Sequence, residues 1–328
     1  MLTSLGVRAA RWARRTDPWT DVVGLARTLL ALGSATTLLF SPTDILFRPV
    51  AGVARAPVCD GLRAADPFCL VPHDHLEVAR WLCFAGLLLV ASGWRPRFTG
   101  LLHFWIAFGI QGSATLIDGG DQVASILALL LVPVTLTDGR KWHWQAAERR
   151  PLEGWEPYRR VLALVALALV RLQVAGIYFH AGEGKMEARE WSDGTALYYW
   201  FSSPDFGAPP WLMHVLRPLI LNGWGVTLLT WGIIVLELSL AAGLVVPKRR
   251  RAWLLAGGLA LHVGIIFVHG LVSFGTIMCA ALVLYLRPIE RELGIAEGVR
   301  GWFARRSSAG RYGAWRKPAA ALATTIGR

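Results

Sequence analysis

The sequence is poor in acidic residues and in the motifs of nucleotide-dependent and zinc enzymes. It has 22 Asp and Glu against 34 Lys and Arg, and charged residues fill only 17% of its 328 positions. No P-loop, GxGxxG, HExxH or nucleophile elbow occurs in a suitable context. These absences argue against ATP-driven transport, soluble-type oxidoreduction and metalloprotease activity.

The start of the sequence has no recognisable signal peptide. Residues 1–20 lack an apolar stretch followed by a cleavage site of small residues, and they carry several arginines. We interpret them as a basic segment on the inner face of a membrane.

Long apolar runs are the most abundant feature. Hydrophobic residues make up 54% of the chain, and its mean hydropathy is +0.44. A helix needs about 20 apolar residues to cross a bilayer, and many runs approach that length. The sequence therefore predicts an all-α polytopic membrane protein with about eight transmembrane helices. Their expected ranges are 21–41, 76–94, 98–117, 122–137, 158–181, 223–246, 252–270 and 272–287.

The positive charges predict the orientation of these helices. With the N-terminus inside, 25 of the 34 Lys and Arg lie in inner segments, seven lie in outer segments, and Arg27 and Arg171 lie within spans. Cytoplasmic connections are enriched in Lys and Arg, so we expect both termini on the inner side of a plasma membrane. The net charge of +12 thus reflects topology and does not indicate a nucleic-acid partner. The transmembrane domain covers 21–290, and 291–328 is a basic inner-face tail.

Two of the four cysteines share the first long outer segment, 42–75. Cys59 and Cys69 lie ten residues apart on the side of the membrane that is usually oxidising, so we expect a loop disulfide. A redox-active pair that exchanges with a substrate thiol is the alternative. Nearby, His73 and His75 flank Asp74, but we interpret this HDH turn as solvated and predict no metal site.

The stretch 167–199 combines an apolar run with ionisable residues. Arg171, Tyr178 and Lys185 recur every seven residues, so they share one face if the helix continues that far. Ionisable groups at membrane depth usually face protein or a water-filled cavity. We take Lys185, Tyr178 and His180 as candidate catalytic residues. Gln173 belongs to the supporting polar network.

Lys185 is the sharpest of these candidates. A lysine at an outer helix end can extend its ammonium to the lipid headgroups without further function. A partly desolvated lysine can instead serve as a base. The aromatic segment that follows, from Trp191 to Phe201, either forms an interfacial belt or covers Lys185 as a lid.

Other polar residues extend the candidate network. Glu237 lies in the middle of a span, where an unpaired carboxylate is costly, and Arg171, His262 or Arg27 could pair with it. A structural pair and a proton relay through Glu237 and His262 are the two explanations. Asp118 and Asp121, in a tight outer turn, are either turn residues or part of the site.

The central stretch resembles the HTTM domain, the membrane domain shared with vitamin K-dependent gamma-glutamyl carboxylase. The pattern is RLQ, then YxxAGxxK, then WxxGxALYY. The start, the cysteine-bearing loop and the length look most like the sporulation-delaying protein B branch. The matching residues are Arg171, Leu172, Gln173, Tyr178, Ala181, Gly182, Lys185, Trp191, Gly194, Ala196, Leu197, Tyr198 and Tyr199.

The resemblance implies a chemistry for Lys185. In the carboxylase, the matching lysine deprotonates vitamin K hydroquinone, and the oxygenated quinone then removes a glutamate proton before CO₂ adds. A reduced quinone is therefore the cofactor that the resemblance implies, and the branch implies a secreted peptide toxin and a small accessory protein as partners. This sequence has Gly184 where the carboxylase has a second lysine, so its substrate need not be glutamate.

Three functions follow for an integral membrane protein with an outward-facing site. The first is a maturation factor that modifies a secreted peptide with Lys185 as base. The second is a non-catalytic component for partner binding, export or immunity. The third is a small-molecule or proton-coupled transporter that uses Glu237 and His262, although the sequence shows none of the inverted repeats common in transporters. The residues alone leave open whether the protein is an enzyme.

Overall fold

Helices provide all the regular secondary structure of the described chain. The computed structural model describes residues 11–50, 52–53, 56–146 and 153–294, and no β-strand occurs within these ranges. This confirms the all-α fold. Residues 1–10 of the expected N-terminal segment, and the expected basic tail from 295 onward, lie outside the described residues.

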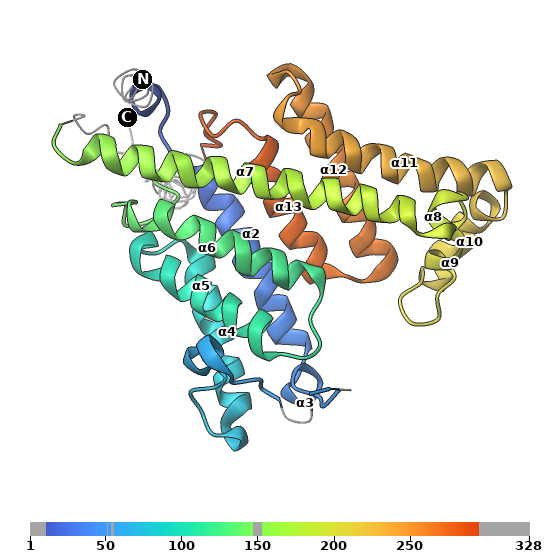
Figure 1. The fold of residues 1–328 in the computed structure, drawn as a ribbon, viewed down its shortest axis with the longest axis horizontal. Helices are drawn as coiled ribbons and strands as arrows, with labels where there is room; N and C mark the ends of the chain where they lie inside the picture. Colours follow the sequence, from blue (N-terminus) through green and yellow to red (C-terminus); the bar gives the residue numbers. More distant parts are fainter. Residues whose placement is uncertain (1–10, 51, 54–55, 147–152, 295–328) are drawn as a thin grey trace, which may run out of the picture. The chain divides into compact units, whose positions relative to one another are not determined.

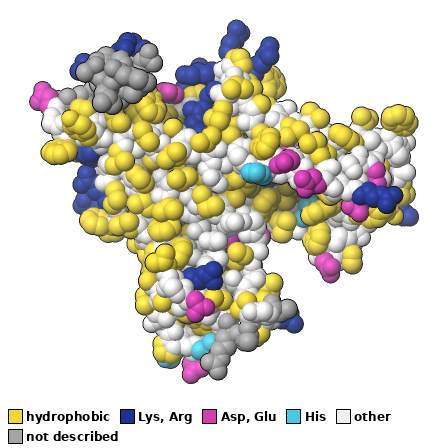
Figure 2. All heavy atoms as spheres, viewed as in Figure 1, with side chains coloured by type: hydrophobic (Ala, Val, Ile, Leu, Met, Phe, Trp, Pro, Cys, Tyr) yellow, Lys and Arg dark blue, Asp and Glu magenta, His cyan; other side chains and the backbone are white. Residues whose placement is uncertain are grey.

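Each expected span corresponds to a helix (Figure 1). Six helical segments are long and apolar enough to cross a membrane, in α2, α4, α6, α7, α11 and α12. Hydrophobic side chains cover most of the face in Figure 2, as expected for helices that meet lipid. The count of eight spans and their orientation stay predictions. The eight helices are α2 (Asp21–Phe40), α4 (Leu76–Ser92), α5 (Pro96–Ser113), α6 (Gly119–Leu136), α7 (Glu156–Glu187), α11 (Gly223–Ala241), α12 (Lys248–His269) and α13 (Val272–Leu286).

Shorter helices lie in the connections. Their bounds are α3 (Thr43–Leu46), η1 (Gly61–Ala65), η2 (His73–His75), α8 (Arg189–Ser192), α9 (Ala196–Phe201), α10 (Pro210–Ile220) and η3 (Ala242–Leu244).

The turn between α5 and α6 differs from the expected spans. α5 ends at Ser113 instead of 117, because the backbone of Ala114 is extended. α6 begins at Gly119 instead of 122, because the Asp118 carboxylate accepts a hydrogen bond from the backbone N–H of Asp121. Asp118 is thus the N-cap of α6, a position that favours aspartate.

α13 occupies the middle of the helix bundle despite its shortness. Its 15 residues rise roughly 22 Å, less than the thickness of the hydrocarbon core. Residues 280–286 are all buried, and α13 packs against α2, α6, α7 and α12. The apolar sequence of its C-terminal half is therefore explained by contact with protein.

The connections collect at two ends of the bundle. At one end the Thr115 N–H donates to the Leu46 carbonyl over 2.8 Å, which joins the α5–α6 connection to α3. At the other end the His143 N–H donates to the Gly93 carbonyl over 2.9 Å. This grouping is the one that an alternating path across the membrane predicts. We call the first the outer end, following the charge-based orientation.

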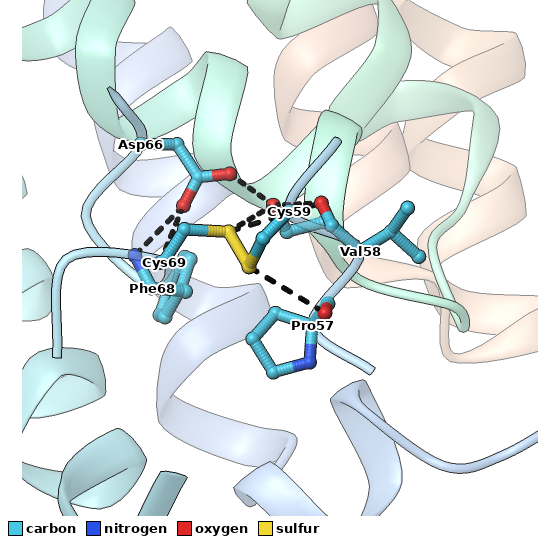
Figure 3. Close-up of a disulfide and its surroundings, with 7 residues drawn as sticks. Pro57, Val58, Cys59, Asp66, Phe68 and Cys69 are labelled. Carbon is cyan, nitrogen blue, oxygen red and sulfur yellow. Dashed lines mark hydrogen bonds between the residues drawn. A yellow bond between two sulfur atoms is a disulfide. The ribbon is translucent and has the colours of Figure 1, made fainter. Parts of the chain in front are cut away.

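A disulfide closes the loop at the outer end (Figure 3). The Cα atoms of Cys59 and Cys69 are 5.6 Å apart, and their sulfur atoms are bonded. The buried carboxylate of Asp66 accepts hydrogen bonds from the N–H groups of Phe68 and Cys69 over 2.8 and 3.0 Å. The loop is therefore fixed by both the covalent bond and this carboxylate.

His143 anchors the α6–α7 connection at the opposite end. Its Nε2 lies 3.2 Å from the Thr28 hydroxyl and its Nδ1 3.4 Å from the Arg27 guanidinium. Gly93 leaves room for the ring: its φ is +85°, and a Cβ there would lie 2.4 Å from the imidazole. Desolvation, with a smaller effect from the charge of Arg27, lowers the pKa of His143 to about 2.

The buried imidazole predicts a loss of stability in acid. Below its ordinary pKa of 6.5, the ring binds a proton in the unfolded chain but stays neutral in the folded one, so falling pH favours unfolding. We expect the thermal unfolding midpoint to fall between pH 7.5 and 5.5, and to fall less in His143→Asn. His180→Asn, at an exposed histidine, should behave as wild type. An equal fall in both variants would contradict the prediction.

Candidate functional site

Lys185 lies in the last turn of α7. The expected span ended at 181, but the helix continues to Glu187, so Arg171, Tyr178 and Lys185 do share one face. A cation is favoured at a helix C-terminus by the backbone dipoles. The Lys185 Nζ donates to the Ala181 carbonyl over 3.3 Å. α7 thus places Lys185 at the outer end, with its ammonium hydrogen-bonded to the helix backbone.

Glu237 of α11 is the ion-pair partner of Lys185. The lysine Nζ lies 2.9 Å from Glu237 Oε1 and 2.8 Å from Oε2. The Glu237 side chain is 9% exposed and that of Lys185 is 23% exposed. The expected partners Arg171, His262 and Arg27 were therefore wrong, and the pair is largely shielded from solvent.

A glycine brings α7 close enough to α11 for this pair to form. A Cβ at Gly182 would lie 2.7 Å from the Leu238 Cδ2, below any normal contact distance. Gly182 and Lys185 are three residues apart, so they lie on neighbouring parts of one helix face. The small size of Gly182 thus permits both the close approach of α7 to α11 and the ion pair.

Substitution of Gly182 is expected to separate the two helices. A leucine at 182 must push Leu238 away, which lengthens the contact between Lys185 and Glu237 and destabilises the fold by about 1–3 kcal/mol. Gly184→Leu is the matched control, because a Cβ at Gly184 meets nothing within 4 Å. The measurement is the thermal unfolding midpoint in detergent. Similar midpoints for the two variants would refute this account of Gly182.

A second polar pair lies beside the first. The Tyr178 hydroxyl and His262 Nε2 are 2.8 Å apart, which joins α7 to α12. His262 is 3% exposed, and its Nδ1 has no hydrogen-bond partner among the described residues. The Phe274 ring lies 5.6 Å from the imidazole. One histidine nitrogen is therefore fixed by Tyr178, and the other is buried without a hydrogen-bond partner among the described residues.

The Lys185–Glu237 pair and His262 line a cavity of about 590 Å³ that we call the lysine cavity. Its volume is typical of small-molecule sites. Lys185, Glu237, His262, Trp191 and Asp118 all contribute to its wall. The Lys185 Nζ lies 5.2 Å from the centre of the Trp191 ring, within the range of a cation–π interaction. Tyr178 does not line the cavity and acts on it through His262.

The aromatic segment after α7 covers one side of the lysine cavity. Leu197, Trp200 and Phe201 of α9 line it together with Trp191 of α8. The Leu197 N–H donates to the Thr230 hydroxyl of α11 over 3.4 Å, which holds α9 against that helix. Of the two alternatives that the sequence left open, an interfacial belt and a lid, this arrangement favours the lid.

Four predicted site residues lie elsewhere. His180 is exposed and pairs with Glu183 at 3.4 Å; it lies five residues from Lys185, about 140° away around the helix. Arg171 lies roughly 21 Å from Lys185 along α7, near Arg251 and Glu290. Gln173 makes no hydrogen bond to another described side chain. Asp121 accepts a hydrogen bond from Thr37 over 3.0 Å and does not line the cavity.

Sequence reasoning missed His269 and Phe274, which also line the cavity. The His269 Nδ1 lies 2.8 Å from the Phe206 carbonyl, and its ring lies 5.9 Å from that of Trp200. Its place at the outer end of an expected span was the available signal. Among the described residues, no cluster of three His, Cys, Asp or Glu could hold a metal ion.

Two proteins of Bacillus subtilis (strain 168) are similar to this chain along most of their length. The uncharacterized protein YitO is 37% identical over 292 residues, which cover 88% of this chain and 92% of YitO. The sporulation-delaying protein SdpB is 37% identical over 279 residues, 84% of each protein. No family model matches the chain. No solved structure matches it either.

Proposed function

Because this chain belongs to the family of sporulation-delaying protein SdpB, we propose that it is a membrane maturation factor for a secreted peptide. It acts at the outer face of the plasma membrane, with a small accessory protein as a further partner. Lys185 is its catalytic base. The observation that carries the proposal is the Lys185–Glu237 pair on the wall of the lysine cavity.

The pair supplies what a lysine base needs. An ammonium group is protonated at neutral pH, so Lys185 must first lose a proton before it can accept one. Glu237 is the acceptor, since both its oxygens lie within 3 Å of the Nζ. Proton transfer leaves a neutral amine and a neutral carboxylic acid, which a shielded site tolerates better than separate charges. The amine then takes a proton from an acidic hydroxyl in the cavity.

The residues of the lysine cavity fit the reduced quinone that the HTTM resemblance implies. The wall is mostly apolar, with Trp191, Trp200 and Phe274 as ring surfaces. Lys185 offers a base to one hydroxyl of the quinone. When bound, a reduced quinone supplies, with oxygen, a base strong enough to remove a carbon-bound proton from a peptide.

The test is oxygen-dependent epoxidation of a reduced naphthoquinone by membranes that contain the full chain. We expect epoxide above the level in membranes without the protein. Loss of the signal when oxygen is excluded is the control for the reaction class. The absence of epoxide, with the protein present and folded, would remove the quinone chemistry.

That negative result would favour a non-catalytic role in partner binding, export or immunity, and the outer segment 182–222 would be the bait for partner isolation.

A transporter that uses Glu237 and His262 makes a different prediction. Its flux in reconstituted vesicles would fall in Glu237→Gln, and unchanged flux would exclude it.

A further inference from the structure

A second cavity lies at the outer end, in a part of the chain that the proposed chemistry does not use. We call it the disulfide cavity, because Cys59 and Cys69 contribute to its wall. Its volume is about 820 Å³, larger than that of the lysine cavity. The size lies within the range of ligand sites, so the cavity has room for several side chains of a ligand.

The floor of the disulfide cavity is apolar. Phe47, Phe68, Ala56 and Leu76 line it and are buried. The Phe47 and Phe68 rings pack with their centres 5.0 Å apart. A ligand with an apolar portion would bury that portion against these side chains and gain the usual free energy of apolar burial.

The wall is held in place before any ligand arrives. The disulfide bonds the two arms of the loop, and Asp66 fixes the backbone of Phe68 and Cys69 (Figure 3). Asp66 also accepts a hydrogen bond from Ser113 of α5. Because the cavity is preorganised, binding does not have to order this loop.

The rim is acidic. Asp44, Asp74 and Glu77 line the cavity together with His73, and no Lys or Arg does so among the described residues. Glu77 is already engaged, since it accepts hydrogen bonds from Thr43 and Arg80. The side chains of Asp44 and Asp74 make no hydrogen bond or ion pair with another described residue, and both residues are exposed. Two unpaired carboxylates thus lie at the edge of an apolar surface. This local negative charge contrasts with the net charge of +12 of the chain.

We propose that the disulfide cavity is a docking site for a basic, apolar segment of the secreted peptide. A Lys or Arg of the peptide pairs with Asp44 and Asp74 at the rim, and neighbouring apolar side chains fill the floor. The proposal rests on the proposed function for the identity of the ligand as a peptide, but binding does not require the chemistry at Lys185.

The fold connects this docking site to the lysine cavity. Thr115 donates hydrogen bonds to the carbonyls of Leu46 and Arg48, the two residues on either side of the cavity residue Phe47. Three residues later Asp118 lines the lysine cavity, so at most about 11 Å of chain separates these two positions. The short α5–α6 connection is therefore in contact with α3 beside the disulfide cavity and also contributes Asp118 to the lysine cavity.

The experiment measures peptide binding to the full chain in nanodiscs of zwitterionic lipid. The probe is Leu-Lys-Leu-Phe-Lys with blocked ends and an uncharged fluorescent label, and its partner has Glu in place of Lys. We expect fluorescence anisotropy to show saturable binding of the Lys probe, at least tenfold tighter than the Glu probe. The Asp44→Asn/Asp74→Asn double variant should weaken Lys-probe binding at least fivefold, and Asp74→Lys should reverse the preference.

Asp205→Asn is the matched control, because Asp205 is an exposed aspartate of the predicted outer side that lines neither cavity. Lys185→Ala should bind the probe as wild type does, which separates docking from catalysis. The proposal is overturned if wild type binds both probes equally or neither, or if the double variant binds like Asp205→Asn. It is also overturned if Lys185→Ala loses the probe. Failure of epoxidation alone would leave it standing.

Discussion

Replacement of Lys185 by alanine is expected to abolish quinone epoxidation while the protein remains folded. The variant removes the only amine that lines the lysine cavity among the described residues. Loss of a general base lowers a rate by about 10²–10⁴-fold. Glu237, left without its partner, can bind a proton and become neutral, so the cost in stability is small compared with the cost in activity.

The measurement is epoxide yield per unit of folded protein in membranes. Lys248→Ala is the control, because Lys248 is an exposed lysine at the start of α12 and lines neither cavity. Lys185→Arg is informative as well, since guanidinium keeps the ion pair but does not release a proton at neutral pH. Activity retained by Lys185→Arg or by Lys185→Ala would exclude Lys185 as the base.

Replacement of Glu237 by leucine is expected to have the largest effect on stability. It leaves the Lys185 ammonium beside an apolar side chain, and its remaining interactions with described residues are with the Ala181 carbonyl and the Trp191 ring. Breaking a buried pair from one side costs about 3–5 kcal/mol. Because Lys185 keeps part of its surface exposed, we expect about 2–3 kcal/mol. The thermal unfolding midpoint in detergent measures the loss.

A second substitution tests whether the loss comes from the unpaired charge. Lys185→Met in the Glu237→Leu background removes the ammonium and should restore most of the stability, since an apolar pair can replace a buried ion pair. Neither protein should form epoxide. If the double variant is as unstable as Glu237→Leu, the defect lies in packing between α7 and α11, and the charge argument fails.

The helices could be predicted well from the sequence because apolar length alone determines where a chain can cross a membrane. All eight expected ranges contain a helix, and the expected span at 158–181 lies within the longer helix α7. The end of α5 was missed because it depends on the extended backbone of Ala114, and the start of α6 because it depends on a single cap, Asp118. The burial of α13 could not be predicted from the sequence, because a helix in contact with lipid and a helix buried in protein have the same apolar composition.

The candidate site was predictable where it depended on helix periodicity. The seven-residue spacing correctly placed Tyr178 and Lys185 on one face, and the same geometry explains why His180 points elsewhere. The partner of Glu237 was not predictable, because it depends on how closely α7 approaches α11, and that distance is set by Gly182. Phe274 lines the site because of tertiary packing, which the sequence does not reveal, and the only sequence signal for His269 was its place at the end of an expected span.

The length of α7 places its lysine at a boundary between two solvents. The stretch 161–182 carries one charged residue, Arg171, and rises roughly 33 Å, close to the thickness of the hydrocarbon core. Lys185 follows about one turn later, near the expected boundary between acyl chains and headgroups. In the proposed function, a lipid-soluble reductant would reach the ammonium from within the bilayer, while the peptide would arrive from the aqueous phase. α7 is thus long enough to let two molecules that share no common solvent meet at one side chain.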